Sequence, residues 1–209
     1  MTKQEKVKEI IKRLSKVYPH PKTALMYESP LQLLIATILS AQATDKLVNT
    51  ITPALFKKYP TAADFAKASL TDIDSMINKV NFHNNKAKSI KGACEMILKK
   101  HNGEVPQTME ELDALPGVAR KTANVVLGNA FHKAEGIVVD THVMRLTIKL
   151  GLTDKKDPVK IEQDLMQIVS KEKWIDFSHL LILFGREYCP ARPHKCEDCP
   201  LKELCPDKP

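Results

Sequence analysis

Hydrophobic residues recur at helical spacing along most of the chain. One series is Val7, Ile10, Ile11, Leu14 and Val17, and another is Ile161, Leu165, Ile168 and Val169. Steps of three and four residues place side chains on one face of a helix. No segment shows the strict alternation that is typical of a half-buried strand. The pattern predicts an all-α protein of about ten helices joined by short loops.

Residues that start helices occur where these series begin. Asp157 and Pro158 supply a helix N-cap and a proline at the first helical position. Thr108 and Glu111 have the spacing of a capping box. The segment SPLQLLIATILSAQ is apolar almost throughout, so it is expected to form a helix that is buried on all sides.

Composition indicates a soluble globular protein. Its 209 residues, 43% hydrophobic and 27% charged, suffice for one or two compact domains. The first residues, MTKQEKVKEIIKRL, do not form a secretory signal, and no apolar run is long enough to span a bilayer. The expected location is therefore cytoplasmic, or associated with the nucleoid if the protein is prokaryotic.

The chain is basic, with a formal net charge of +7 and a pI near 9.1. This charge suits a polyanionic partner, although mild basicity also serves solubility alone. Positive charge is concentrated in residues 79–101, which contain Lys79, Lys86, Lys88, Lys91, Lys99 and Lys100.

The segment LPGVARKTANVVL, residues 115–127, predicts a tight turn between two helices. Pro116 and Gly117 form the turn, and the second helix begins near Ala119. Backbone N–H groups at such a positive helix end can hold a DNA phosphate without reading sequence. An ordinary corner between two helices explains the turn equally well.

Lys121 lies in the first turn of this second helix. The positive end of the helix dipole and the neighbouring Arg120 both favour the neutral form of its amine. A neutral lysine is a nucleophile that can form a Schiff base. The alternative is a solvated lysine that contacts phosphate.

Asp140 follows three apolar residues in GIVVDTHVMRL and precedes another helical series. This position predicts a helix N-cap. A carboxylate at such a junction could also take a proton, or stabilise positive charge developing on a sugar. His142 is interpreted as a packing or surface residue.

Four of the five cysteines lie close to the C-terminus in the pattern C-x6-C-x2-C-x5-C: Cys189, Cys196, Cys199 and Cys205. In a reducing compartment such a set indicates a metal site, and its proline-rich loop can wrap an iron–sulfur cluster. Structural zinc is the alternative, although zinc ribbons usually contain two C-x2-C pairs. The fifth cysteine, Cys94, shares a helical face with Ile90 and Ile97 and is expected in the core.

In their order along the chain, these motifs resemble the endonuclease III family of helix-hairpin-helix DNA glycosylases, which are bifunctional DNA glycosylases and AP lyases. The resemblance covers essentially the whole chain through SPLQLLIATILSAQATD, HNGEVP, LPGVARKTANVV, VVDTHV and the four-cysteine loop. It implies an all-α, two-domain fold with DNA in the cleft between the domains. A six-helix barrel would span residues 22–132, and an iron–sulfur cluster domain would combine residues 1–21 and 133–209.

The same resemblance implies roles for individual residues. Lys121 matches the catalytic lysine and Asp140 the catalytic aspartate, while the four cysteines match the ligands of a [4Fe–4S] cluster. Residues that match DNA contacts are Gln42 and Phe82, which would enter the base stack, and Pro116, Gly117, Val118 and Ala119 of the hairpin. The implied substrate is damaged double-stranded DNA that contains an oxidised or ring-saturated pyrimidine.

The implied reaction begins when the damaged nucleotide rotates out of the stack. Lys121 then attacks C1′, the base leaves as an imine forms, and β-elimination breaks the strand.

Two positions depart from the family pattern. Ala119 replaces a second hairpin glycine, and we expect alanine to suit the first helical turn. Asn81 replaces a glycine before Phe82, and asparagine tolerates a left-handed backbone.

Other activities fit less well. Adenine-specific mismatch glycosylases would have a glutamate near Thr37, no lysine at position 121 and an additional C-terminal domain. Relatives that act on uracil or mismatched thymine without lyase activity generally lack the lysine. A non-catalytic DNA-binding module would use Lys121 as a phosphate contact and Asp140 only as a cap. Nothing in the sequence indicates an obligate oligomer, so a monomer is expected.

Overall fold

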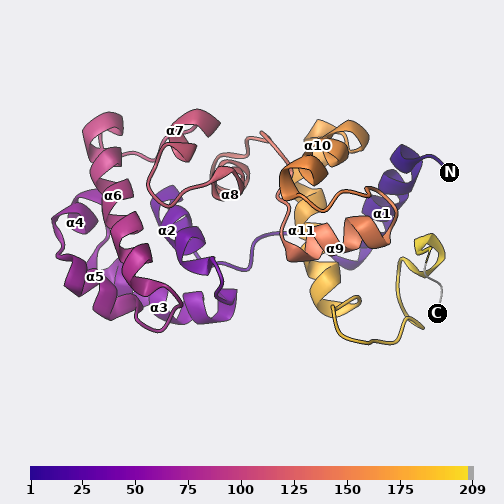
Figure 1. The fold of residues 1–209 in the computed structure, drawn as a ribbon, viewed down its shortest axis with the longest axis horizontal. Helices are drawn as coiled ribbons and strands as arrows, with labels where there is room; N and C mark the ends of the chain where they lie inside the picture. The colour runs from indigo at the N-terminus through magenta and orange to yellow at the C-terminus, as the bar shows by residue number, and fades with distance from the viewer. Residues whose placement is uncertain (207–209) are drawn as a thin grey trace. The chain divides into compact units, whose positions relative to one another are not determined.

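The computed structural model describes residues 1–206, which contain helices and loops and no strand (Figure 1). The chain divides into two compact units. The central unit is Thr23–Lys133, and the terminal unit combines Met1–Lys22 with Ala134–Pro209. The expectation of an all-α fold is confirmed.

The central unit is built around one apolar helix. Its helices are α2 (Pro30–Ser40), α3 (Asp45–Lys58), α4 (Ala62–Lys67), α5 (Leu70–Ile77), α6 (His83–His101), α7 (Met109–Asp113) and α8 (Arg120–Phe131). Every residue of α2 from Leu33 to Leu39 is buried, and the helix packs against α3, α6 and α8. The prediction of a helix buried on all sides is therefore confirmed.

Short polar side chains start most of these helices. Ser29, Thr44, Thr61, Ser69 and Thr108 each accept a hydrogen bond from a backbone N–H in the first turn. This satisfies donors that the helix itself leaves unpaired. The capping box predicted at Thr108 is only half formed. The Thr108 hydroxyl accepts from the Glu111 N–H at 3.3 Å, but the Glu111 carboxylate accepts from the Thr108 hydroxyl, at 2.7 Å, rather than from the Thr108 N–H.

The terminal unit combines the N-terminal helix with the helices that follow the central unit. Its helices are α1 (Lys3–Val17), α9 (Thr141–Lys149), α10 (Pro158–Ile168) and α11 (Trp174–Glu187), with short 3₁₀ helices η1 (Lys171–Lys173) and η2 (Lys202–Leu204). Helix α11 packs against α1 and α9, and Phe177, Leu180 and Leu181 from it are fully buried. Asp157 caps α10 with Pro158 at its first position, as predicted.

Helices α9 and α11 approach closely because Gly185 lacks a side chain. A Cβ at this position would lie 2.8 Å from His142 Nδ1 and 3.0 Å from Leu146 Cδ1. His142 therefore packs against α11, which is the first of the two alternatives, packing or surface, that the sequence left open.

Helix α1 holds the C-terminal segment. The Arg13 guanidinium donates to the Glu203 carboxylate at 2.8 Å and to the Pro200 carbonyl at 3.3 Å. Tyr18 donates to the Glu187 carboxylate at 2.8 Å. The N-terminal helix thus fixes the segment that contains the last cysteines. Within residues 1–206, no helix is long and apolar enough to cross a membrane.

Candidate functional site

The segment between α7 and α8 forms the predicted hairpin. Leu115 and Val118 anchor it in the core, and the Val118 N–H donates to the Leu115 carbonyl at 3.1 Å. Between them, Gly117 adopts a left-handed φ of 74° and is exposed. The turn therefore presents backbone to the surface while its two apolar neighbours hold it in place.

Gly117 also lies against α6. A Cβ at this position would lie 2.4 Å from Ser89 Cβ and 2.6 Å from its hydroxyl oxygen. Both the positive φ and the close approach of Ser89 therefore require glycine here.

Replacing Gly117 by alanine is expected to destabilise the central unit by about 3 kcal/mol, combining left-handed strain with overpacking against Ser89. Gly103→Ala is the matched control, because its φ is 86° but its nearest neighbour would be Leu98 Cδ2 at 3.7 Å. The control should lose only about 1 kcal/mol. Thermal unfolding compares them, and equal losses in the two variants would show that the Ser89 contact is unimportant.

The structure changes the expected roles of two hairpin residues. The Val118 side chain is 7% exposed and its N–H already has a partner, so its side chain and amide are directed into the protein. Ala119 is the N-cap of α8 and not, as expected, a first-turn residue. Alanine is a poor N-cap because its side chain accepts no hydrogen bond. The start of α8 therefore has no side-chain cap.

Lys121 is exposed in the first turn of α8, one residue after Arg120. No acidic residue lies in that turn. Its ammonium is consequently placed at the positive end of a helix, beside the hairpin, where an anionic phosphate would also bind.

Asp140 is half-buried at the N-cap of α9, and its Oδ1 accepts a hydrogen bond from the Val143 N–H at 2.8 Å. The preceding Ile137 and Val139 are buried, and the Val138 N–H donates to the Ser178 hydroxyl at 3.0 Å. These contacts fix the backbone that enters the cap. The predicted N-cap is confirmed, and within residues 1–206 the second oxygen, Oδ2, accepts no hydrogen bond.

Gln42 and Phe82 both lie in left-handed backbone, with φ of 56° and 58°, and both side chains are exposed. Phe82 is 60% exposed, which is unusual for a large aromatic side chain. Asn81, a residue type that tolerates left-handed backbone, does not have a positive φ here. Its amide instead donates to the Gln42 carbonyl at 3.2 Å and connects the two loops.

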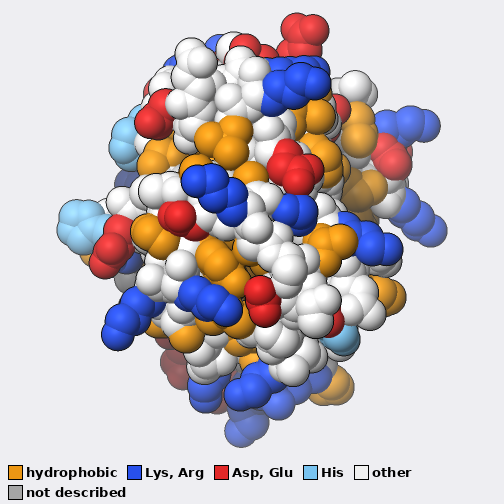
Figure 2. All heavy atoms as spheres, turned by 90° about the vertical axis from the view of Figure 1, so that its left-hand side faces the viewer, with side chains coloured by type: hydrophobic (Ala, Val, Ile, Leu, Met, Phe, Trp, Pro, Cys, Tyr) orange, Lys and Arg blue, Asp and Glu red, His pale blue; other side chains and the backbone are white. Residues whose placement is uncertain are grey.

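The lysine-rich stretch is less available to a partner than its sequence indicated. Lys86 is buried, and the Lys91 ammonium binds the carbonyls of Ala66 and Ala68. Figure 2 views the central unit from the side of α4, α5 and α6, where basic side chains are interspersed with acidic ones. The exposed lysines of the stretch are Lys79, Lys88, Lys99 and Lys100.

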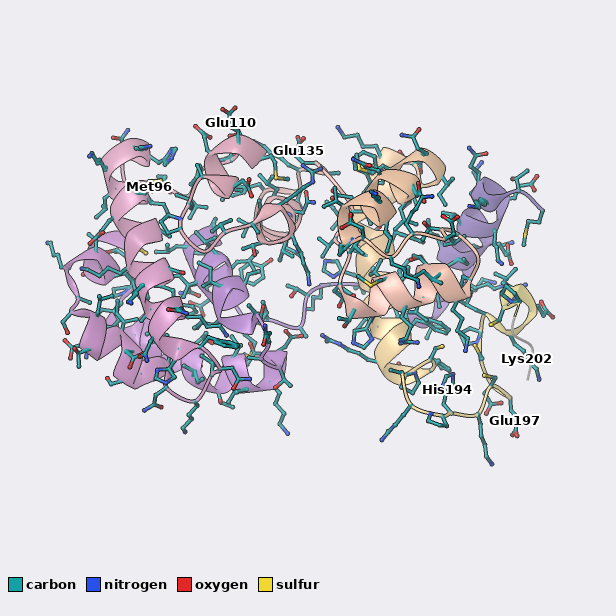
Figure 3. The ribbon with its side chains drawn as sticks, viewed as in Figure 1. Met96, Glu110, Glu135, His194, Glu197 and Lys202 are labelled. Carbon is teal, nitrogen blue, oxygen red and sulfur yellow. The ribbon has the colours of Figure 1, made fainter. Side chains whose placement is uncertain are left out.

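All four C-terminal cysteines line one cavity in the terminal unit. The residues around it are Leu146, Lys149, Leu150, Phe184, Cys189, His194, Cys196, Cys199, Leu201, Lys202 and Cys205. Figure 3 shows His194 and Glu197 on the loop after α11, and Lys202 at the start of η2. Among the described residues, no three His, Cys, Asp or Glu side chains gather closely enough to hold one metal ion. The four thiols thus share a cavity without converging on one ion-sized position.

Two polar residues at this cavity were not identified from the sequence. The Arg145 guanidinium donates to the Cys189 carbonyl at 2.6 Å and approaches its Sγ at 3.7 Å. His194 accepts or donates at Nδ1 with the Arg192 carbonyl at 2.9 Å, and its Nε2 is buried without a partner in the described chain. No sequence signal connects Arg145 to a cysteine 44 positions away.

Cys94 is 1% exposed in the core of the central unit, as predicted, and burial raises the pKa of its thiol to about 12. The candidate residues divide between the units: Gln42, Phe82, the hairpin and Lys121 belong to the central unit. Asp140 and the four C-terminal cysteines belong to the terminal unit.

Comparisons with known proteins identify relatives that match most of this chain. Residues 35–171 match the family described as HhH-GPD superfamily base excision DNA repair protein. The chain is 50% identical to endonuclease III of Synechocystis sp. over 205 residues, which are 98% of this chain and 94% of that protein.

Solved structures are similar over the full length. A non-covalent endonuclease III–DNA complex matches with a TM-score of 0.92 and 41% identity, covering 100% of this chain and 97% of that one. A trapped endonuclease III–DNA covalent intermediate matches with the same TM-score, identity and coverage.

Proposed function

Since the chain belongs to the endonuclease III family of the HhH-GPD superfamily of base excision DNA repair proteins, we propose that it excises oxidised pyrimidines from double-stranded DNA and cleaves the strand by AP lyase chemistry. The observation that carries this proposal is the exposed Lys121 at the start of α8, beside a hairpin whose Gly117 turns backbone to the surface. A covalent DNA intermediate is known for a structure 41% identical to this chain. We propose that the protein acts as a monomer.

In this reaction the hairpin holds phosphate and Lys121 acts on the sugar. Backbone N–H groups at the start of α8 bind the DNA backbone without reading sequence, so the enzyme can act wherever damage occurs. The Lys121 amine attacks C1′, and the C1′–N bond to the base breaks as the new C–N bond forms. The C1′–O4′ bond of the sugar then breaks, O4′ takes a proton, and C1′ forms an imine with the lysine nitrogen. This imine makes the C2′ hydrogen acidic, and loss of that proton breaks the C3′–O3′ bond and expels the 3′ phosphate.

Gln42 and Phe82 would occupy the space in the stack that the rotated nucleotide leaves. An exposed aromatic ring inserted there replaces lost stacking and holds the duplex open. A damaged, poorly stacked base rotates out at the lowest cost, which contributes to selectivity.

The cysteine-lined cavity fits a [4Fe–4S] cluster held by Cys189, Cys196, Cys199 and Cys205. Such a cluster uses one thiolate on each iron, and the four cysteines that would supply them line this one cavity. Arg145, Lys149 and Lys202 place positive charge around the thiolates, and the buried His194 Nε2 lacks a partner in the described chain. When bound, the cluster supplies structural cross-linking of the C-terminal segment.

The protonation of the cysteine thiols should affect assembly of the cluster in this cavity. Burial raises the pKa of the Cys199 thiol, and the other three cysteines raise it further. Since ligation requires thiolates, cluster assembly should become less efficient as pH falls.

The direct test of the proposed function is incubation of the purified protein with duplex DNA that contains one thymine glycol. Release of the damaged base together with strand cleavage, without added alkali, supports a bifunctional enzyme. Base release without cleavage would indicate a monofunctional glycosylase, and binding without either reaction would indicate a DNA-binding module.

Asp140 can be tested separately as a cap and as a catalytic group. Asp140→Asn keeps an oxygen for the Val143 N–H, so stability should stay within about 0.5 kcal/mol. Base release should nevertheless fall about a hundredfold or more, because the carboxylate charge is gone. Asp140→Ala should in addition lose about 1 kcal/mol of stability.

Thermal unfolding and single-turnover base release measure the two effects. An Asp140→Asn enzyme with normal base release would show that Asp140 is only a helix cap.

A further inference from the structure

Lys86 is a buried cation in the central unit. Its side chain lies in the first turn of α6 and the residue is only 6% exposed. Burial lowers the pKa of its ammonium, and removing such a group from water is unfavourable unless its hydrogen bonds are satisfied. Nζ donates to the Leu39 carbonyl at 2.8 Å and to the Ala41 carbonyl at 2.6 Å. The Lys86 ammonium therefore already has hydrogen-bond partners within the protein, unlike an exposed lysine that could bind a DNA phosphate.

These two carbonyls belong to the C-terminal end of α2. Helix α2 ends at Ser40, Ala41 is its C-cap, and Gln42 follows with a φ of 56°. The last carbonyls of a helix have no partner within it and carry partial negative charge. The buried Lys86 ammonium binds the carbonyls of the residues before and after Ser40. It therefore fixes the path of the backbone just before Gln42, which has a left-handed φ.

The same lysine belongs to the turn that carries Phe82. The Lys86 backbone N–H donates to the Phe82 carbonyl at 3.0 Å and closes the first turn of α6. Phe82 is the N-cap of that helix and its side chain makes no capping bond. Asn81 adds a second link by donating to the Gln42 carbonyl at 3.2 Å. Two side chains thus bind three carbonyls at the end of α2. Lys86 binds those of Leu39 and Ala41, and Asn81 binds that of Gln42.

We propose that Lys86 is a positioning residue that joins the Gln42 turn to the Phe82 turn, so that both side chains are presented to the DNA stack in a fixed relation. This inference rests on the proposed function, in which these side chains fill the gap left by the rotated nucleotide. Fixing both turns before binding removes an ordering cost that would otherwise be met when DNA binds. Lys86 itself does not touch DNA.

The chain supplies a matched control on the same helix. Lys91 of α6 binds the carbonyls of Ala66 and Ala68 at the end of α4, just as Lys86 binds those at the end of α2. Helix α4 carries neither Gln42 nor Phe82. Lys86→Met and Lys91→Met therefore remove the same charge and the same kind of helix-end contact, and only the first affects the two turns.

The test compares binding of each variant to a duplex that contains a tetrahydrofuran abasic site and to the intact duplex. In Lys86→Met the ratio of affinity for the abasic duplex to affinity for the intact duplex should fall about tenfold, since the side chains of Gln42 and Phe82 must then be ordered on binding. Lys91→Met should keep the wild-type preference. A double variant, Lys86→Met with Gln42→Ala, should lose less than the sum of the two single effects, because both act on the same turn.

Borohydride trapping on a single-stranded abasic oligonucleotide separates positioning from chemistry, because that substrate requires no insertion into a stack. Lys86→Met should trap as well as the wild type. Failure of the wild-type protein to trap would contradict the proposed function. Normal trapping, together with the same preference for the abasic duplex in Lys86→Met and Lys91→Met, would contradict only the role of Lys86.

The salt dependence of DNA binding tests whether Lys86 contacts phosphate directly. If Lys86 bound phosphate, its removal would lower the slope of log Kd against log salt by about 1. The proposal requires the slope of Lys86→Met to equal that of Lys91→Met, and a drop confined to Lys86→Met would overturn it. If Lys86→Met does not fold, Asn81→Ala removes the exposed link to Gln42 and should reduce the same preference. An unchanged preference in that variant would also overturn the proposal.

Discussion

Lys121→Gln is expected to abolish strand cleavage at a damaged base while leaving DNA binding largely intact. The substitution removes the amine that forms the imine, so cleavage should fall about a thousandfold or more. Binding should change by about fivefold or less, because a single exposed charge contributes little. Gel analysis of cleaved strands and a binding assay at fixed salt concentration measure the two effects.

Lys99→Gln is the matched charge control, since Lys99 is an exposed residue in the last turn of α6. It should cleave like the wild type. Equal loss of binding and cleavage in Lys121→Gln would contradict the assignment of Lys121 as nucleophile and favour a phosphate contact.

Loss of one cysteine ligand is expected to have the second large effect. Cys196→Ser should lower the iron content and remove the visible absorbance of the cluster. Because a structural metal contributes folding energy, the melting temperature of the terminal unit should fall by about 10 °C or more. DNA affinity should decline before the chemical step does, since Lys121 belongs to the other unit.

Cys94→Ala is the control, because that thiol is buried in the core of the central unit and away from the cavity residues. It should retain full iron content despite some loss of stability. Normal DNA binding with lost base release in Cys196→Ser would contradict a structural role and indicate that the cluster takes part in catalysis.

Much of the fold follows from local sequence. A helix formed by the apolar run Leu33–Leu39 has no polar face to expose to water, so the sequence predicts that it is buried in the core. Helix starts at Asp157 and Asp140 follow from a side-chain oxygen placed before a helical series. The turn at Gly117 follows from a Pro-Gly pair between two such series.

Contacts between distant residues could not be predicted in the same way. In the sequence Lys86 is one lysine of the basic stretch 79–101, but its partners are carbonyls 45 and 47 positions earlier in the chain. Nothing in local periodicity identifies a cation that will be buried against a helix end. Arg145 is similar, because its partner Cys189 is brought close only by the packing of α9 against α11.

Backbone conformation at the two loops was also only partly predictable. Asparagine adopts a left-handed conformation more readily than phenylalanine, so local preference alone favours Asn81 for it. In the structure Asn81 uses its amide to bind the Gln42 carbonyl, and Phe82 adopts the positive φ instead. A long-range hydrogen bond here outweighs the local preference. The roles of Gln42, Phe82, Lys121, Asp140 and the four C-terminal cysteines stay predictions.

Borohydride trapping on a duplex with a single thymine glycol shows directly whether Lys121 is the nucleophile. We expect a covalent protein–DNA adduct for the wild type and none for Lys121→Gln, because only an imine at that lysine can be reduced onto the DNA. Absence of an adduct from wild-type protein that binds the same duplex and contains its full iron complement would contradict the lysine mechanism.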